Sequence, residues 1–217
     1  MRLDLPKIYP ITDTQLSGLS HAEQVTRLIK GGASLIQLRD KFSPPRDFYR
    51  EAAAALQIAR VHGVRLIIND RVDIALALKA DGVHLGQTDI PVAAARHLLG
   101  QKAIIGFSTH NVEQAKLAGA LPIDYLAFGP IFPTLSKNNP DPTTGLVALS
   151  EVVTIKYSLP LVAIGGIRRK NALEVLKVGA DAVALIAELM ADPNKIAENM
   201  SKMLTRTSTT FNEPSLS

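Results

Sequence analysis

The sequence of 217 residues contains no cysteine, and aromatic residues make up only 5% of it. Without cysteine the chain forms no disulfide, holds no thiolate-bound zinc and has no cysteine nucleophile, and a reducing, cytoplasmic location is favoured. It also lacks an uninterrupted run of about 18 apolar residues, which argues against a transmembrane span. The opening MRLDLPKIYP has no long apolar stretch of the signal-peptide kind, and we expect it to lead into a strand.

The net charge does not by itself indicate what class of ligand the chain binds. The formal net charge is +4 and the pI is near 9.4. Basic proteins often bind nucleic acid, but here the basic residues are scattered and few aromatic side chains are present for base stacking. Small anionic ligands account for the charge equally well. We therefore expect phosphorylated small molecules as partners, without nucleic acid or membrane, while assembly into a homo-oligomer stays open.

Hydrophobic residues make up 47% of the chain, enough for one packed core. Eight short, nearly continuous apolar runs are typical of parallel strands buried on both faces. They cover residues 8–13, 34–40, 65–70, 82–86, 103–109, 125–131, 161–167 and 182–188. Helix-start patterns stand between them, such as Ser20 with Glu23, Ser43 before two prolines, and Asn111 with Gln114.

Eight successive β–α units predict an α/β fold, a single-domain (β/α)₈ TIM barrel over residues 1–205. A doubly wound open sheet is the alternative, but it usually has a glycine fingerprint after its first strand, and Ile11-Thr12-Asp13 does not provide one. Residues 206–217 are polar and without periodicity, and we expect a disordered C-terminal tail there.

Polar side chains gather where the predicted strands end, which is the active-site side of a TIM barrel. Asn69 and Asp70 end the third strand, and Asp89 follows the fourth. Neighbouring parallel strands lie about 4.8 Å apart, so both aspartates can reach one Mg²⁺ ion at about 2.1 Å and leave room for phosphate oxygens. The alternative for each aspartate is a cap on the helix that follows it.

Cationic side chains end the second predicted strand. Gln37, Arg39 and Lys41 share strand parity and lean to one side. A bidentate guanidinium beside an ammonium suits a diphosphate bridged by Mg²⁺. A surface pairing of the two cations with Asp40 and Asp47 is the alternative.

Further candidates come from later loops. Lys137 lies in a loop, residues 137–144, that can close over the site, although a solvated lysine is the simpler interpretation. Gly165-Gly166 and the helix start after them can offer backbone N–H groups to a phosphate, or can mark tight packing alone. His84 fits a core or supporting role better than that of a general base. The other histidines lack metal-ligand spacing: His21, His62, His97 and His110.

From residue 8 to residue 189 the chain resembles the thiamine phosphate synthase family. The resemblance rests on QLRDK (37–41), INDRVDIAL (68–76), ADGVHLGQTD (80–89), GFSTHN (106–111), FGPIFPT (128–134) and VAIGGI (162–167). It implies a transferase that joins 4-amino-2-methyl-5-hydroxymethylpyrimidine diphosphate to 4-methyl-5-hydroxyethylthiazole phosphate. The products would be thiamine monophosphate and diphosphate, formed by a Mg²⁺-assisted dissociative substitution. Such a reaction needs no protein nucleophile, only charge neutralisation and alignment of the two rings.

The resemblance also implies a role for each matching residue. The pyrimidine diphosphate contacts would be Gln37, Arg39, Lys41, Asn69, Ser108 and Lys137, of which Arg39, Lys41, Ser108 and Lys137 would be catalytic. Asp70 and Asp89 would ligate Mg²⁺. The thiazole phosphate contacts would be Thr134, Ser136, Gly166, Ile186 and Ala187.

Three positions depart from the family pattern. Ala187 stands where the family usually has serine, and the lost hydroxyl removes one hydrogen bond to the thiazole phosphate, which predicts a higher KM and not an inactive enzyme. Thr88 replaces a frequent glutamate beside the metal ligand. Ser136 replaces a common threonine and keeps the hydroxyl.

Three other functions are alternatives to this one. A related thiazole tautomerase shares the barrel but does not keep the metal pattern that is intact here at residues 69–70 and 87–89. A catalytically silent thiamine-binding or regulatory paralogue is favoured only by Ala187. A phosphate-binding barrel isomerase of amino-acid biosynthesis would need an acid–base pair at the strand ends, where only Asp70 stands out.

Overall fold

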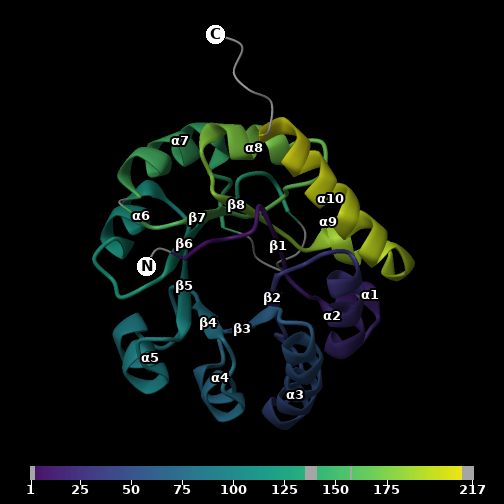
Figure 1. The fold of residues 1–217 in the computed structure, drawn as a ribbon. Helices are drawn as coiled ribbons and strands as arrows, with labels where there is room; N and C mark the ends of the chain where they lie inside the picture. The colour runs from purple at the N-terminus through teal and green to yellow at the C-terminus, as the bar shows by residue number, and fades with distance from the viewer. Residues whose placement is uncertain (1–2, 135–140, 157, 212–217) are drawn as a thin grey trace.

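Eight parallel strands form a barrel with helices around its outside (Figure 1). The computed structural model describes residues 3–134, 141–156 and 158–211, with the backbone alone for residues 208–211. The strands are β1 (Ile8–Pro10), β2 (Leu35–Leu38), β3 (Arg65–Asn69), β4 (Gly82–Leu85), β5 (Ile104–Thr109), β6 (Tyr125–Phe128), β7 (Leu161–Ala163) and β8 (Ala182–Leu185). From β2 to β8 each strand pairs with the next one in sequence, and β1 pairs with β8.

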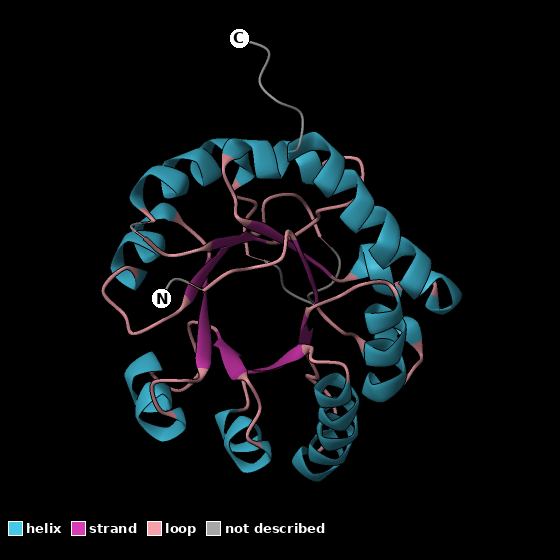
Figure 2. Ribbon diagram, in the orientation of Figure 1, coloured by secondary structure: helices cyan, strands magenta, loops and turns pink. Residues whose placement is uncertain are grey.

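The ring is closed between β1 and β2. Ile11 forms a parallel bridge with Gln37, and the Thr12 N–H donates to the Gln37 carbonyl at 2.9 Å. Figure 2 shows the strands as a ring inside a shell of helices. This closure confirms the predicted TIM barrel and excludes the open doubly wound sheet.

The helices alternate with the strands along the chain. They are α1 (Thr14–Ser17), α2 (His21–Lys30), α3 (Pro45–Val61), α4 (Val72–Leu78), α5 (Val92–Leu99), α6 (Val112–Ala118), α7 (Gly145–Ile155), α8 (Ala172–Val178), α9 (Ala187–Met190), the 3₁₀ helix η1 (Pro193–Lys195) and α10 (Ile196–Phe211). The predicted capping box is present, because Ser20 Oγ accepts from the Glu23 N–H at 3.2 Å and Glu23 Oε2 accepts from the Ser20 N–H at 3.0 Å. Among the described residues, no helix combines the length and apolar character needed to cross a bilayer.

The ends of most strands and the end of the last helix differ from the sequence predictions. Most strands end one to four residues earlier than predicted, because the backbone there leaves the sheet to form the loops over the barrel mouth. The expected irregular tail from Arg206 is wrong as far as Phe211, because α10 continues to that residue. Thr207 is 2% exposed there, and its hydroxyl donates to the Met203 carbonyl at 3.1 Å, so a polar residue is buried within a helix at little cost. Residues 212–217 lie outside the described part of the chain.

The core has two layers. The larger one packs the outward faces of the strands against the helices, and a smaller one fills the barrel interior with side chains such as Tyr9, Leu35, Ile67 and Tyr125. Gly106 makes room for the phenol of Tyr125, since a Cβ at this glycine would lie 2.0 Å from the Tyr125 Cζ. The interior is therefore a packed core on which the site at the strand ends is built.

Three aspartates tie the strands together at the opposite, N-terminal end of the barrel. Each precedes an even-numbered strand and accepts a hydrogen bond from a backbone N–H of the strand before it. The three bonds run from Leu66 to Asp81 at 2.7 Å, from Ile105 to Asp124 at 2.7 Å and from Leu161 to Asp181 at 2.8 Å. Arg96, whose side chain is 9% exposed, pairs with Asp124 at 2.6 Å. This end of the barrel contributes stability.

Candidate active site

A cavity of about 730 Å³ is lined by the residues that follow the strand ends. The predicted site residues on its lining are Gln37, Arg39, Lys41, Asn69, Asp70, Asp89, Ser108, Thr134, Gly166, Ile186 and Ala187. The fold thus brings together every predicted site residue that the structure describes. Ser136 and Lys137 lie outside the described residues.

Asp70 occupies an unusual backbone conformation directly after β3. Its φ is 61°, in the left-handed region that non-glycine residues rarely adopt. Its carboxylate pairs with the Lys41 ammonium. The helix-cap alternative is wrong, because the N-cap of α4 is Arg71 and no side chain accepts a capping bond there.

Asp89 lies beside Asp70 at the same edge of the cavity. Its Oδ2 accepts from the Gly86 N–H at 2.7 Å, and it does not cap α5, whose N-cap is Pro91. Burial raises the pKa of Asp89, and the neighbouring Asp70 carboxylate raises it further. A cation between the two carboxylates would offset this repulsion.

This pair fits a hard divalent cation such as Mg²⁺. Carboxylate oxygens are ligands that Mg²⁺ prefers, and it usually completes its coordination with water and substrate phosphate. Within the described residues, no three His, Asp or Glu side chains gather at one point. An ion held here would therefore rely on the two aspartates together with oxygens of a substrate.

The two cations of the QLRDK segment face the cavity and are held by acidic partners. Arg39 Nη1 lies 3.5 Å from Asp13 Oδ2, and Lys41 pairs with Asp70. The alternative of a surface pairing with Asp40 and Asp47 is wrong. The side chain of Arg39 is only 14% exposed, so its charge acts in a partly desolvated place.

Asn69 has an unsatisfied donor in this cavity. Its residue is 6% exposed, and its Nδ2 has no hydrogen-bond partner. A buried amide donor without a partner costs about 1–3 kcal/mol. Such a group on a cavity lining is suited to donate to a ligand.

A chain of hydrogen bonds crosses the barrel interior along the cavity lining. Gln37 Nε2 donates to the Tyr9 hydroxyl at 3.2 Å, the Tyr9 and Tyr125 hydroxyls lie 3.0 Å apart, and His84 links the Tyr125 hydroxyl to Ser108 Oγ with two contacts of 2.8 Å. Burial lowers the pKa of His84 to about 4, so the ring is neutral near pH 7. His84 is thus buried and hydrogen-bonded in the barrel interior, as predicted, and its supporting role stays a prediction.

Sequence reasoning missed Tyr9 and Tyr125 as parts of this region. A tyrosine inside an apolar strand needs a partner for its hydroxyl, and that is the pattern that would have found both. Arg168 was missed as well, although it lines the cavity two residues after the Gly165-Gly166 pair.

Packing explains the Gly165-Gly166 pair in part, which agrees with the alternative prediction that these glycines mark tight packing. The two φ values are 98° and 62°, and a Cβ at Gly166 would lie 2.5 Å from the Pro133 carbonyl oxygen. Glycine at this position therefore lets the loop after β7 lie against the loop after β6. The same approach gathers Thr134, Gly166 and Ala187 on one cavity lining.

Comparison with known proteins assigns the family. A sequence profile described as thiamine monophosphate synthase matches residues 8–189. The chain belongs to the thiamine monophosphate synthase family. A protein of Clostridium novyi named thiamine-phosphate synthase is 45% identical over 85% of this chain and 90% of its own length. A protein of Persephonella marina with the same name is 42% identical over 93% of this chain and 95% of its own length.

A solved structure agrees with these relatives. The thiamine phosphate pyrophosphorylase from Pyrococcus furiosus is 38% identical, superimposes with a TM-score of 0.81, and shares 92% of this chain and 95% of its own. Membership of this family makes the chain an enzyme, a transferase of thiamine biosynthesis like its relatives. Nothing in these matches supports the tautomerase or the silent-paralogue alternative.

Proposed function

We propose that the chain joins the pyrimidine diphosphate to the thiazole phosphate, with thiamine monophosphate and diphosphate as products. The proposal rests on one observation, which is how charged and polar residues are arranged around a single cavity. Arg39, Lys41 and the Asp70–Asp89 pair stand together on its lining, and Thr134 and Gly166 belong to the same lining. Such a site suits a diphosphate and a second, single phosphate.

The diphosphate end is built to stabilise a leaving group. Asp70 and Asp89 would hold Mg²⁺, which when bound neutralises diphosphate charge and so assists departure. The Arg39 guanidinium can bind phosphate oxygens in a bidentate manner, and Lys41 adds a compact charge beside it. Lys41 pairs with Asp70, which places its ammonium beside the carboxylates that would hold the metal ion and the diphosphate.

The pyrimidine ring would lie against polar groups at the ends of β2, β3 and β5. Asn69 offers its unpaired Nδ2, Gln37 offers the amide oxygen that the Tyr9 contact leaves free, and Ser108 offers a hydroxyl held by His84. These side chains orient the reacting carbon and keep it in a region with little water. Alignment of two rings for capture of a carbocation requires this kind of rigid support.

The thiazole phosphate would bind where the loops after β6, β7 and β8 meet. Thr134 offers a hydroxyl there, and Gly166, Ile186 and Ala187 offer backbone groups. Arg168 lines the same cavity, and we expect its charge to offset part of the contact that Ala187 lacks. Ser136 and Lys137 stay predictions.

Product formation tests the proposal. Both phosphorylated substrates are supplied with Mg²⁺, and thiamine monophosphate and released diphosphate are measured; no product at any thiazole concentration would contradict the proposal. Asp70→Ala and Arg39→Ala should each lower turnover by about 10²-fold, on the scale of losing one preorganised charge contact. Asp47→Ala and Arg50→Ala are matched controls, because this pair lies on the exposed face of α3.

A further inference from the structure

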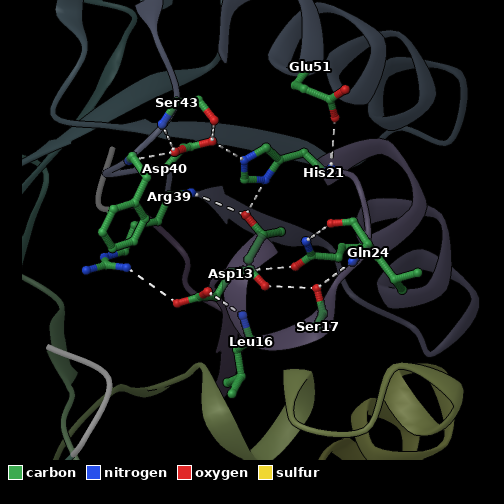
Figure 3. A network of polar contacts seen from close by, with 12 residues as sticks. Asp13, Leu16, Ser17, His21, Gln24, Arg39, Asp40, Ser43 and Glu51 are labelled. Atoms are coloured by element: carbon green, nitrogen blue, oxygen red, sulfur yellow. Dashed lines mark hydrogen bonds and ion pairs between the residues drawn. The ribbon is translucent and has the colours of Figure 1, made fainter. Parts of the chain in front are cut away.

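A buried polar network lies beside Arg39, one of the two cationic residues proposed to bind the diphosphate (Figure 3). It joins the end of β1, the first residue of α2 and the turn after β2. His21 and Asp40 are its centre, with side chains 0% and 2% exposed. His21, Asp40 and Thr12 are absent from the cavity lining, so the network supports the site from outside it.

The Thr12 hydroxyl fixes the backbone at Arg39. It accepts from the Arg39 N–H at 3.2 Å, and it lies 2.8 Å from His21 Nδ1. This contact is shorter than the 3.4 Å from the same hydroxyl to the Gln37 carbonyl. Asp40, which lies on the other side of the ring, can only accept, so the neutral ring suits both neighbours when Nε2 carries its proton and Nδ1 accepts from the Thr12 hydroxyl.

His21 turns that proton toward Asp40. Its Nε2 is buried without a hydrogen-bond partner and lies 3.5 Å from Asp40 Oδ2. Burial lowers the pKa of His21, which keeps the ring neutral. The backbone N–H of His21 also donates to Glu51 Oε2 at 3.1 Å, so the start of α2 is anchored to α3.

Asp40 in turn shapes the turn that carries Lys41. Its Oδ1 accepts from the N–H groups of Phe42 and Ser43 at 2.9 Å each, and its Oδ2 accepts from Ser43 Oγ at 2.7 Å. These bonds close a local turn with Lys41 at its tip. The position of the Lys41 backbone therefore depends on the Asp40 carboxylate, which His21 faces.

Asp13 completes the support from the other side. Its Oδ2 lies 3.5 Å from the Arg39 guanidinium, while its Oδ1 accepts from the Leu16 N–H at 3.0 Å. Its own N–H donates to Gln24 Oε1 at 2.9 Å. These two bonds fix the position of Asp13, and its Oδ2 in turn restrains the orientation of the Arg39 guanidinium.

We infer that Thr12 and His21 are positioning residues for the diphosphate cations. They act through the Arg39 backbone and the Asp40 turn and touch no substrate. The inference rests on the proposed function, since it assumes that Arg39 and Lys41 bind the diphosphate. It predicts an effect confined to the diphosphate end, with the thiazole phosphate end unchanged.

Isosteric variants separate this role from general stability. Thr12→Val removes the hydroxyl at nearly constant volume, and Thr12→Ser keeps it. His21→Leu removes both nitrogens, and His21→Gln keeps an amide donor toward Asp40. Thr207→Val is the matched control, because Thr207 is an equally buried threonine on α10, far along the chain from the cation segment.

Calorimetry with inorganic diphosphate and Mg²⁺ gives the direct readout, together with the KM of each substrate and the melting temperature. Residues that orient metal ligands typically change metal affinity or activity by about 10- to 100-fold, and we take the same scale for residues that orient the diphosphate-binding cations. We expect Thr12→Val and His21→Leu to weaken diphosphate binding by at least about tenfold. The KM for thiazole phosphate should stay unchanged, Thr12→Ser and His21→Gln should recover most of the affinity, and Thr207→Val should bind as the wild type.

Wild-type diphosphate affinity in folded Thr12→Val overturns the inference, and so does an equal loss at both substrate ends. If His21→Leu does not fold, the comparison of Thr12→Val with Thr12→Ser decides. Wild-type protein that binds diphosphate but forms no thiamine monophosphate contradicts the proposed function, and Thr12→Val still tests the inference. Wild-type protein that binds no diphosphate in the presence of Mg²⁺ contradicts both.

Discussion

Replacing Tyr125 by phenylalanine removes one hydroxyl from the middle of the barrel and leaves the ring in place. That hydroxyl lies 3.0 Å from the Tyr9 hydroxyl and 2.8 Å from His84 Nδ1, and all three groups are buried. The variant loses two hydrogen bonds of about 0.5–1.5 kcal/mol each, and a buried polar group left without a partner costs about 1–3 kcal/mol. We expect the free energy of unfolding to fall by about 2–3 kcal/mol, and the melting temperature by about 5–10 °C for a chain of this length.

Urea denaturation measures this change, with Tyr49→Phe as the control. Tyr49 is on α3 and 40% exposed, so the loss of its hydroxyl should change stability by less than about 0.5 kcal/mol. We also expect lower turnover in Tyr125→Phe, because His84 is no longer held against Ser108. A stability for Tyr125→Phe equal to that of Tyr49→Phe would show that the hydroxyl chain contributes nothing.

Three further changes test other parts of the account. Ala187→Ser should lower the KM for thiazole phosphate about 2- to 10-fold, on the scale of one hydrogen bond, and an unchanged KM would contradict that contact. Burial lowers the pKa of His84 from 6.5 to about 4, so between these two values the unfolded state binds a proton that the folded state does not. The free energy of unfolding should therefore rise by about 2 kcal/mol from pH 5 to pH 8. An equal rise in His84→Gln would show that other groups cause this pH dependence. Asp124→Ala removes the partner of Arg96 and of the Ile105 N–H and should lower stability by about 2 kcal/mol without changing either KM, as denaturation and kinetics would show.

The fold could be predicted because each strand is an apolar run and each helix has its own start pattern. These are local properties, and buried parallel strands give the strongest of them. The strand ends were less predictable, since apolar residues continue past the sheet. Ile131, for example, stays 1% exposed in the loop after β6 because its side chain packs in the outer core.

The charged residues of the site could be predicted from their positions after the strands. Arg39 and Asp70 directly follow β2 and β3, Lys41 and Asp89 lie three and four residues after the ends of β2 and β4, and the barrel gathers strand ends by construction. Their partners could not be predicted, because they depend on ring closure. Asp13 reaches Arg39 only because β1 lies beside β2.

The interior contacts escaped prediction for a related reason. Tyr9 and Tyr125 are 116 residues apart in sequence and meet inside the barrel. Contacts across such a distance leave no periodic pattern in the sequence. His21 looked like an isolated histidine at the start of a helix, and only the fold shows that it faces Asp40.

The Mg²⁺ dependence of diphosphate release from the pyrimidine substrate tests the central claim most directly. Release is followed in wild type and in Asp89→Asn over a range of Mg²⁺ concentrations. We predict that release requires Mg²⁺ and that the half-saturating Mg²⁺ concentration rises at least about tenfold in the variant, because one of the two carboxylate ligands is lost. Release at the full rate in the presence of a chelator, or an identical Mg²⁺ dependence in both proteins, would contradict the account.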